Sequence, residues 1–388
     1  MQAPPTIFSQ IISWIHRETF QRIVVRHRAD YKIQSFSCWD QFLCMAFAQL
    51  TYRESLRAIE VCLRSRQNQL YHLGIRGNVS RSTLAYANET RSWQIYAELA
   101  YRLIGRARKL YARDDFGVEL KQTAYALDAS TIDLCLNLFP WAHFRSTKAG
   151  IHLNTLLDLR GSIPSLIHIT PADVHEVNWL DELIFELGAF YIMDRGYLDF
   201  KRLYLIQLAK AFFVTRAKCN TQLRRLYSRR VDKNTGLRCD HVVRPANFYA
   251  AQDYPDALRR IKFYDEKSKR FFIFLTNNFD VSALTICQLY QKRWQVELFF
   301  KWIKQNLRIK NFYGTSDNAV RTQIWIAICV YVLVAIIKKE LNLPFSLYEI
   351  LQILSVNAFE QTPLQQLFAK STSPNPIPHS HNQLLLNF

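Results

Sequence analysis

The amino-acid sequence predicts an α/β protein in which a mixed sheet with flanking helices follows a helical N-terminal region. Three observations lead to this class. Through the first hundred residues, apolar side chains recur at intervals of three and four, as in amphipathic helices. From Lys121, short apolar or alternating runs between Gly, Pro and polar turns indicate strands. After Ser282 the helical period returns, and it persists to about Leu341.

In the N-terminal region, helices are expected at three stretches. They are CWDQFLCMAFAQL, YRESLRAIEVCLRS and TRSWQIYAELAYRLIGRARKLY. Between the last two, Ser80 or Ser82 can cap a further short helix. The side chains expected to point outward from it are Arg81, Thr83, Tyr86 and Asn88. This helix resembles the second half of a helix-turn-helix, which enters a DNA major groove, but a solvated helix of a bundle explains the same residues equally well.

The central region predicts strands and helices in a definite order. Strands are expected at TAYALDAST, IHLNTLLDLRG and SIPSLIHITPA, followed by a helix at HEVNWLDELIFELG. A strand at AFYIMDRG, a helix at YLDFKRLYLIQLAK and a strand at AFFVTRAK complete the series. Three strands followed by helix, strand, helix and strand indicate a mixed sheet with helices packed on it.

The stretch from Cys219 to Asn278 differs from its surroundings, because it is polar, basic and rich in turns. Strands are expected there at GLRCDHVV and RFFIFLTNN. Residues 216–230 hold six basic residues and no acid. Such a run is usually a solvated face, but beside a catalytic sheet it also suits contact with a phosphate backbone.

The charge balance indicates a polyanionic partner. Fifty Lys and Arg residues oppose 32 Asp and Glu, for a net charge of +18, which favours nucleic acid first and an anionic membrane surface second. The run IWIAICVYVLVAII is shorter than the roughly 20 residues that span a bilayer, so a buried helix is expected. No secretory signal is recognisable, and a cytoplasmic, nucleoid-associated location is expected. Cys219, Cys239 and His241 lack a recognisable fourth zinc ligand.

Two aspartates come at the ends of predicted apolar strands. They are Asp128 in YALDAST and Asp194 in YIMDRGY. An acid at the exit of a strand lies where a sheet opens to solvent and where ligands gather. Either one by itself is as easily explained as a cap or turn residue. A catalytic role therefore needs a further acid to join them.

The stretch YQKRWQVELFFKWIK carries one acid, Glu297, among aromatic and basic residues. On a helix, Glu297 falls within a sector of about 60° together with Tyr290, Arg293 and Lys304. The apolar stripe beside this sector comprises Leu289, Val296, Phe300, Ile303 and Leu307. The helix can bury this stripe against the sheet and present Glu297 at its edge, although a basic amphipathic helix without a site shows the same pattern.

The three acids become informative when they are combined. Carboxylates within about 4 Å repel one another by roughly 4 kcal/mol per pair at an effective dielectric constant near 20. Such a cluster requires a divalent cation, and oxygen ligands without Cys or His suit Mg²⁺ or Mn²⁺ better than Zn²⁺. Two such ions can activate a nucleophile and stabilise the leaving oxygen of a phosphodiester.

This arrangement resembles the DDE transposases of bacterial insertion sequences that carry the YREK signature, the insertion sequence 4 family. Two aspartates precede the pattern Tyr-x2-Arg-x3-Glu-x6-Lys, with the residues Asp128, Asp194, Tyr290, Arg293, Glu297 and Lys304. The stretches SFSCWDQFLCMAFAQLTYRESLR, FYIMDRGYLDFKRLY and RWQVELFFKWIKQNLRIKNFYGTS also look like members of this family. The resemblance implies an RNase H-like core with the three acids as catalytic metal ligands, and contact of Tyr290, Arg293 and Lys304 with transposon-end phosphates.

The expected organisation follows from this resemblance and from the element order. It comprises a helical DNA-binding domain (1–118), a first part of the catalytic core (119–218), a mainly β insertion (219–280), a second part of the core (281–345) and a C-terminal helix and tail (346–388). Some family members use a Trp in the insertion to stack on a flipped base during hairpin formation, but residues 219–278 contain none. The available rings are Tyr227, Phe248, Tyr249 and Tyr254.

The predicted function is that of a transposase, which binds terminal inverted repeats, cleaves them by metal-dependent attack of water and joins the freed 3′ hydroxyl to target DNA. A homodimer on paired DNA ends is expected. Further DNA contacts are expected from Arg81, Lys218, Arg224, Arg225, Arg229 and Arg230. The alternatives are an RNase H-like nuclease without strand transfer and a non-catalytic DNA-binding protein derived from a transposase.

Overall fold

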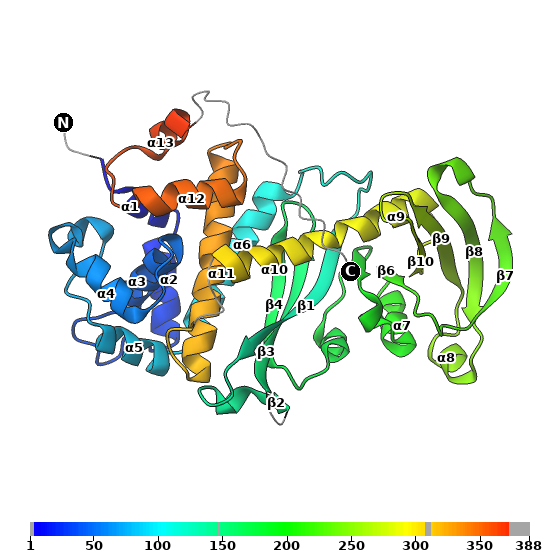
Figure 1. Ribbon diagram of the computed structural model, residues 1–388, viewed down its shortest axis with the longest axis horizontal. Helices are drawn as coiled ribbons and strands as arrows, with labels where there is room; N and C mark the ends of the chain where they lie inside the picture. The colour runs from blue at the N-terminus through cyan, green and yellow to red at the C-terminus, as the bar shows by residue number, and fades with distance from the viewer. Residues whose placement is uncertain (1–3, 146–147, 307–311, 372–388) are drawn as a thin grey trace.

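A computed structural model describes residues 4–145, 148–306 and 312–371 (Figure 1). Its first part is helical, as predicted. The helices are α1 (Ile7–Ile12), α2 (Arg17–Arg26), α3 (Cys38–Leu50), α4 (Leu56–Arg64), α5 (Arg81–Thr90) and α6 (Gln94–Tyr111). Three helices from the end of the chain share their hydrophobic core: α11 (Asp317–Glu340), α12 (Leu347–Asn357) and α13 (Leu364–Ser371). The rest of the expected tail, residues 372–388, lies outside the described part of the chain.

Local sequence explains where two of these helices begin. Ser37 starts α3 with a capping box, because its hydroxyl accepts the N–H of Asp40 while the Asp40 carboxylate accepts the N–H of Ser37. The Ser80 hydroxyl accepts the N–H of Thr83 and so caps α5, as predicted. Both helices therefore begin where a hydroxyl satisfies an otherwise unpaired N–H.

The outward face expected for α5 is wrong at one position. Arg81, Thr83 and Tyr86 are exposed, as expected, but Asn88 is only 2% exposed. Its amide oxygen accepts a hydrogen bond from the side chain of Gln41 on α3 at 2.9 Å. Asn88 therefore anchors α5 to the bundle, and the partner that makes its burial favourable belongs to another helix.

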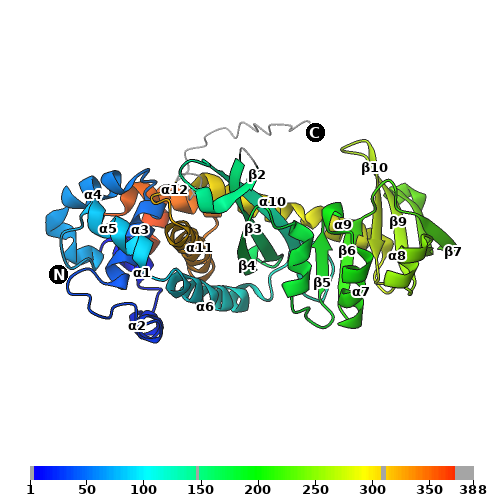
Figure 2. The ribbon, with the colours of Figure 1, turned by 90° about the horizontal axis from the view of Figure 1, so that it is seen from below.

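Helix α11 is the centre of the helical region. Residues 324–337 are all buried, which confirms the predicted buried helix. By length and composition α11 could cross a membrane, but 94% of its most apolar window is buried inside the protein. It packs against α3, α5, α6 and α12, and Figure 2 shows it beside α6. The N-terminal helices thus enclose a helix from residues beyond 300.

Ten strands of the described residues form one sheet. They are β1 (Ala124–Leu134), β2 (His143–Arg145), β3 (Lys148–Asp158), β4 (Ile163–Pro171), β5 (Phe190–Met193), β6 (Phe212–Arg216), β7 (Leu223–Arg229), β8 (Leu237–Pro245), β9 (Leu258–Asp265) and β10 (Arg270–Thr276). The strand order is β2-β3-β1-β5-β6-β10-β9-β8-β7, and β4 also pairs with β3.

The sheet is mixed, as predicted. β3 pairs antiparallel with both β1 and β4, whereas β1 and β5, and β5 and β6, pair in parallel. This arrangement is consistent with an RNase H-like core. Strands β7 to β10 form an antiparallel series that joins the core sheet through β10 and β6 (right in Figure 1). The expected insertion therefore extends the core sheet and does not form a sheet of its own.

Different elements cover the two faces of the core sheet. Helix α7 (Phe200–Leu208) buries Leu203 and Ile206 with Tyr125, Leu127 and the side chains that share their face. Helices α9 (Ala283–Lys292) and α10 (Trp294–Asn306) share the other core with alternate residues of the same strands. The period-two alternation of strand side chains explains why β1 serves both cores.

The helix expected at HEVNWLDELIFELG is wrong. The chain forms only a 3₁₀ segment there, Glu176–Glu182, followed by extended backbone at Leu183. Trp179 and Leu180 are buried, but Ile184 is 96% exposed. The apolar residues of this stretch therefore do not share one buried face, so packing does not stabilise a longer helix.

Candidate active site

Asp128 lies within β1, and the strand end expected at this residue is wrong. β1 pairs antiparallel with β3 from Tyr125 to Leu134. Its parallel pairing with β5, however, stops at Leu127↔Met193. After β5 has ended, β1 thus continues in its antiparallel pairing with β3. Asp128 is the first β1 residue beyond the parallel ladder.

Asp194 follows β5 directly, as predicted. Because Met193 pairs with Leu127, Asp194 and Asp128 each come one residue after the last parallel pair. Neighbouring strands lie about 4.8 Å apart. The register of two buried strands therefore brings both aspartates to the same edge of the sheet. The Thr215 hydroxyl of β6 donates to the Asp194 carbonyl at 3.1 Å, which ties this edge to the next strand.

The helix expected at YQKRWQVELFFKWIK consists of two helices. α9 ends at Lys292 and α10 begins at Trp294, and Arg293 between them donates its N–H to the Tyr290 carbonyl at 3.1 Å. The predicted apolar stripe is confirmed for Leu289, Val296, Phe300 and Ile303, which are at most 5% exposed. Leu307 lies outside the described residues. Burial of this stripe places α10 against β1 and β3.

The edge beside the stripe carries the four predicted side chains, of which three contact β1 or the residue after β5 and the fourth, Glu297, contacts Arg293. Arg293 Nη1 donates to Asp128 Oδ2 at 2.7 Å, and its Nη2 donates to Glu297 Oε1. The Tyr290 hydroxyl donates to Asp194 Oδ1 at 3.1 Å. Lys304 Nζ donates to the Thr131 carbonyl of β1 at 2.6 Å.

These contacts connect Tyr290 to Asp194 and connect Arg293, and through it Glu297, to Asp128, whereas Lys304 contacts β1 three residues beyond Asp128. The aspartates come from β1 and from the end of β5, and the other four side chains come from α9, α10 and the residue between them. In this structure Tyr290 and Arg293 therefore bind the candidate catalytic acids themselves.

Burial and charge act against each other at Asp128. Burial raises the pKa of Asp128 to about 6, with Glu297 and Glu176 adding to the rise and Arg293 opposing it. Burial alone would lower the pKa of Arg293, but Asp128, Tyr290 and Glu297 hold it above its ordinary value. Burial also raises the pKa of Tyr290 to about 12. The Asp128 carboxylate thus depends on Arg293 to remain ionised near neutral pH.

The candidate metal ligands fit a hard divalent cation by their chemistry, because all three supply carboxylate oxygens. A buried polar atom beside Asp128 also lacks a partner: Thr155, which pairs with Asp128 across β1 and β3, has a fully buried hydroxyl without a hydrogen bond in the described structure. Among the described residues, no three Asp, Glu, His or Cys side chains stand close enough to hold a metal ion. In this arrangement Arg293 stands between Asp128 and Glu297.

Two residues near the acids were not among the predicted site residues. Glu176 is close enough to raise the pKa of Asp128. Tyr197 is 2% exposed, and its hydroxyl has no hydrogen-bond partner in the described part of the chain. In the sequence, the only indication that Tyr197 lies near the acids was its position three residues after Asp194. Its place in the structure depends on the turn that follows β5.

A small aromatic pocket adjoins Arg293. It has a volume of about 200 Å³, and its lining includes Phe263, Phe272, Phe274, Tyr290 and Trp294. These phenylalanines were not among the predicted site residues, because their convergence depends on the pairing of β9 with β10.

The rings that the sequence did offer for stacking differ in exposure. Tyr227, Phe248 and Tyr249 are exposed, at 58%, 76% and 74%. Tyr254 is fully buried against Tyr204 and Phe213. Tyr254 is therefore part of the core, and its candidacy as a stacking ring is wrong.

The other predicted DNA contacts fall into two groups. Arg81 on α5, Arg224 and Arg225 on the edge strand β7, and Arg230 just after it are exposed. Lys218 and Arg229 already contact the protein. Lys218 donates to the Leu198 carbonyl at 3.3 Å, and Arg229 donates to the Phe279 carbonyl at 2.9 Å.

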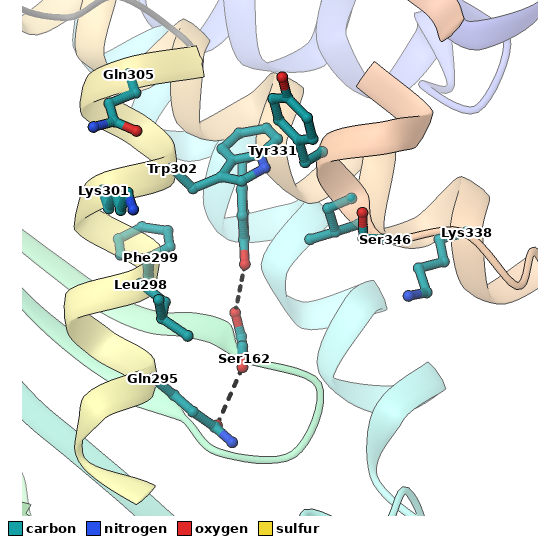
Figure 3. A pocket seen from close by; sticks show the side chains of 12 residues that line it. Ser162, Gln295, Leu298, Phe299, Lys301, Trp302, Gln305, Tyr331, Lys338 and Ser346 are labelled. Atoms are coloured by element: carbon teal, nitrogen blue, oxygen red, sulfur yellow. Dashed lines mark hydrogen bonds between the residues drawn. The ribbon is translucent and has the colours of Figure 1, made fainter. Parts of the chain in front are cut away.

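A larger pocket, of about 700 Å³, lies on a different face of α10 (Figure 3). Its lining includes Leu298, Trp302 and Tyr331. Ser162 connects its walls, since its hydroxyl donates to Gln295 at 3.2 Å and its carbonyl accepts from the Tyr331 hydroxyl at 2.9 Å. None of its twelve lining residues is an Asp or Glu. This pocket is therefore separate from the acids, and the candidate site is located by the chemistry of its side chains.

Comparison with known proteins gives two family matches. A family described as a transposase DDE domain matches residues 119–333, the range that contains all three acids. A domain of unknown function matches residues 4–76.

Individual relatives agree with these matches. A putative transposase of Sinorhizobium fredii is 31% identical over 304 residues, which are 77% of this chain and 82% of the relative. A probable transposase for insertion sequence element IS5377 of Geobacillus stearothermophilus is 28% identical over 226 residues, which are 57% of this chain and 59% of the relative. A putative transposase for insertion sequence element IS4SA of a Synechocystis species is 26% identical over 71% of this chain and 78% of its own.

Proposed function

The chain belongs to the family of transposases with a DDE domain, and from this premise we propose that it binds the terminal inverted repeats of an insertion sequence, cleaves its ends and joins them to target DNA. The observation that carries the proposal is the register that sets Asp128 and Asp194 one residue beyond the parallel ladder of β1 and β5. Glu297 on α10, which Arg293 connects to Asp128, supplies the third acid. The spacing from Tyr290 to Lys304 supports assignment to the insertion sequence 4 family.

DDE transposase domains generally use divalent metal ions, and here Asp128, Asp194 and Glu297 would hold two Mg²⁺ or Mn²⁺ ions. When bound, the ions would activate the attacking group and stabilise the leaving oxygen of the phosphodiester. The protein supplies the positions. Sheet pairing orients the two aspartates, and burial of the apolar stripe of α10 orients Glu297. Because in-line displacement needs alignment and charge stabilisation, one triad can serve cleavage and joining in turn.

Transposases act on DNA, and the charge of this chain supports such a partner. In the proposed complex, Tyr290, Arg293 and Lys304 leave their contacts with the sheet edge and bind phosphates of the transposon end. The exposed basic side chains on and just after β7, near the start of the insertion, extend the contact, and α5 is proposed to read the inverted repeat. The additional phosphate contacts are Arg81, Lys218, Arg224, Arg225, Arg229 and Arg230. Two copies of the chain are proposed to act on paired ends.

The aromatic pocket beside Arg293 supports a site for an unstacked base. Its rings, among them Phe263, Phe272 and Trp294, adjoin both Tyr290 and Arg293. Stacking of a base on an aromatic side chain contributes roughly 1–3 kcal/mol. A hairpin step with base flipping is therefore proposed to use this pocket, although the insertion contains no Trp between residues 219 and 278.

The test of the proposed function is the substitution Asp194→Ala. It should abolish Mg²⁺-dependent cleavage of transposon ends in the full-length protein while leaving DNA binding, measured by mobility shift, within a few-fold of the wild type. Asp280→Ala is the matched control, because Asp280 is an exposed aspartate on the loop before α9. Cleavage retained by Asp194→Ala would overturn the assignment. Joining of precleaved ends to target DNA by the wild type separates a transposase from a nuclease without strand transfer.

A further inference from the structure

Arg293 binds two of the three proposed metal ligands at the same time. It contacts Asp128 at 2.7 Å through Nη1 and Glu297 through Nη2. We propose that Arg293 is the resident counter-cation of these carboxylates, which competes with divalent ions for them until a DNA phosphate draws it away. The inference rests on the proposed function, and it adds to it a linkage between DNA binding and metal binding.

The charges at the site support competition. Three ionised carboxylates carry three negative charges and Arg293 carries one positive charge, so the site has a net charge of about −2. One divalent ion balances this charge, whereas a second ion leaves the site positive as long as Arg293 stays. Departure of Arg293, together with arrival of a negative phosphate, restores the balance. Two ions are therefore favoured when DNA is present and disfavoured when it is absent.

The position of the guanidinium makes the competition direct. Asp128 lies on β1 and Glu297 on α10, so the planar guanidinium spans the space between sheet and helix with one nitrogen on each acid. An ion bound by both acids needs the same carboxylate oxygens and the same space. The side chains of Arg293 and Asp128 are only 16% and 17% exposed. Water therefore screens their attraction less than it would at the surface.

Arg293 is also poised to exchange partners. Its Nε is buried and has no hydrogen-bond partner in the described part of the chain. A phosphate can accept two parallel hydrogen bonds from an arginine, as a carboxylate can. A phosphate that binds Arg293 frees both acids at once. By thermodynamic reciprocity, DNA then tightens metal binding by the same factor by which metal tightens DNA binding.

The test is a titration of the DNA-free, full-length protein with Mn²⁺, followed by the electron paramagnetic resonance signal of the free ion. Arg293→Gln should bind Mn²⁺ about tenfold more tightly than the wild type, which falls within the range of about 5- to 150-fold common for coupled sites. Arg293→Lys, which keeps the charge without the fork, should fall between them. An affinity of Arg293→Gln equal to or weaker than that of the wild type would overturn the proposal.

Arg321→Gln is the matched control. Arg321 is 18% exposed, pairs with Asp317 one helical turn away at 2.7 Å and lies over the Trp93 ring, much as Arg293 pairs with Glu297 and lies over Tyr290. Its ion pair belongs to α11 and not to the sheet edge. Its replacement should leave the Mn²⁺ affinity unchanged. A tightening equal to that of Arg293→Gln would show a general effect of lost positive charge and would also overturn the proposal.

A second titration tests the linkage with DNA. A duplex of the transposon end should tighten Mn²⁺ binding by the wild type about tenfold more than it tightens binding by Arg293→Gln. Equal tightening would contradict the role of Arg293. A different result would show that the proposed function is wrong: Asp194→Ala would retain both end cleavage and Mn²⁺ affinity. If Asp194→Ala loses both while Arg293→Gln binds Mn²⁺ like the wild type, only the present inference fails.

Discussion

Two arginines of this protein, the buried Arg259 and the partly buried Arg293, hold carboxylates in contrasting ways. Arg259 on β9 meets Asp240 on β8 through two parallel hydrogen bonds of 2.9 and 2.7 Å, and both side chains are at most 4% exposed. Its Nη1 also donates to the carbonyls of Asn278 and Val281, at 3.4 and 2.6 Å, in the loop that leads to α9. Each nitrogen of the Arg259 guanidinium therefore has a partner.

Arg293 contacts two carboxylates, one more than Arg259, but its guanidinium makes fewer hydrogen bonds than that of Arg259. It divides its two terminal nitrogens between Asp128 and Glu297, and its Nε has no partner in the described structure. Asp128 shares Arg293 with Glu297, whereas Asp240 accepts two hydrogen bonds from Arg259 and also lies 3.9 Å from Arg229 Nε. Because every guanidinium nitrogen of Arg259 is hydrogen-bonded, the Arg259–Asp240 pair is a structural contact. Arg293 has an Nε without a partner in the described structure, so it is able to exchange partners.

Arg259→Ala is expected to have the largest effect on stability. It leaves Asp240 buried without its bidentate partner, so the free energy of unfolding should fall by about 3–5 kcal/mol. Urea denaturation measures this loss. Joint replacement by Arg259→Met and Asp240→Leu should recover most of it, because no charge then remains buried.

Arg202→Ala is the reference for this comparison. Arg202 pairs with Asp181 nearer the surface, where the two side chains are 22% and 49% exposed, so its loss should cost about 1 kcal/mol or less. If Arg259→Ala lowered the free energy of unfolding by as little as this, the structural role of the Arg259–Asp240 pair would be contradicted.

Asp128→Asn is expected to stabilise the metal-free protein in a pH-dependent way. The folded-state pKa of Asp128 is about 6, above an unfolded value near 3.9, so the folded state binds more protons between these values. The stability contributed by protonated Asp128 is therefore present below about pH 4 and is lost as the pH rises through 6. At pH 8 in EDTA, Asp128→Asn should gain roughly 3 kcal/mol, and at pH 4 it should gain nearly nothing.

Urea denaturation at the two pH values checks this expectation. Asp280→Asn, at an exposed aspartate, should show no such difference between pH 4 and pH 8. An equal gain of Asp128→Asn at both pH values would mean that burial of the charge does not destabilise the site.

Tyr290→Phe is expected to have the smallest effect. The ring keeps its contact with Phe274, whose centroid lies 4.8 Å away, and only the hydrogen bond to Asp194 is lost. The cost should be about 1 kcal/mol or less, measured by urea denaturation at neutral pH. A loss approaching that of Arg259→Ala would place Tyr290 among the structural contacts and would weaken the contrast between the two regions.

Several features could be predicted from the sequence because they depend on a few neighbouring residues. The period of apolar side chains located α3, the buried face of α10 and the buried run of α11. The hydroxyl of Ser80 marked the start of α5. Asp194 was expected after a short apolar strand, and it follows β5 directly. Helical period, capping and strand alternation are local, so they can be recognised without the partner elements.

Other features depended on residues far apart in the chain. No local pattern indicates that Asn88 turns inward to Gln41, that Tyr254 is buried, or that the insertion continues the core sheet through β10 and β6. The helix expected after β4 is absent for the same reason, because no element of the described structure covers Ile184.

The sequence by itself therefore determined which residues are candidates for the chemistry, since the acids and their spacing are written in it. Only the tertiary structure decided what those residues contact. Arg293 was expected to face DNA phosphates, but in the folded chain it binds Asp128 and Glu297. The physical reason is that a buried charge is stable only beside an opposite one, and which charges meet depends on the packing of α10 against β1.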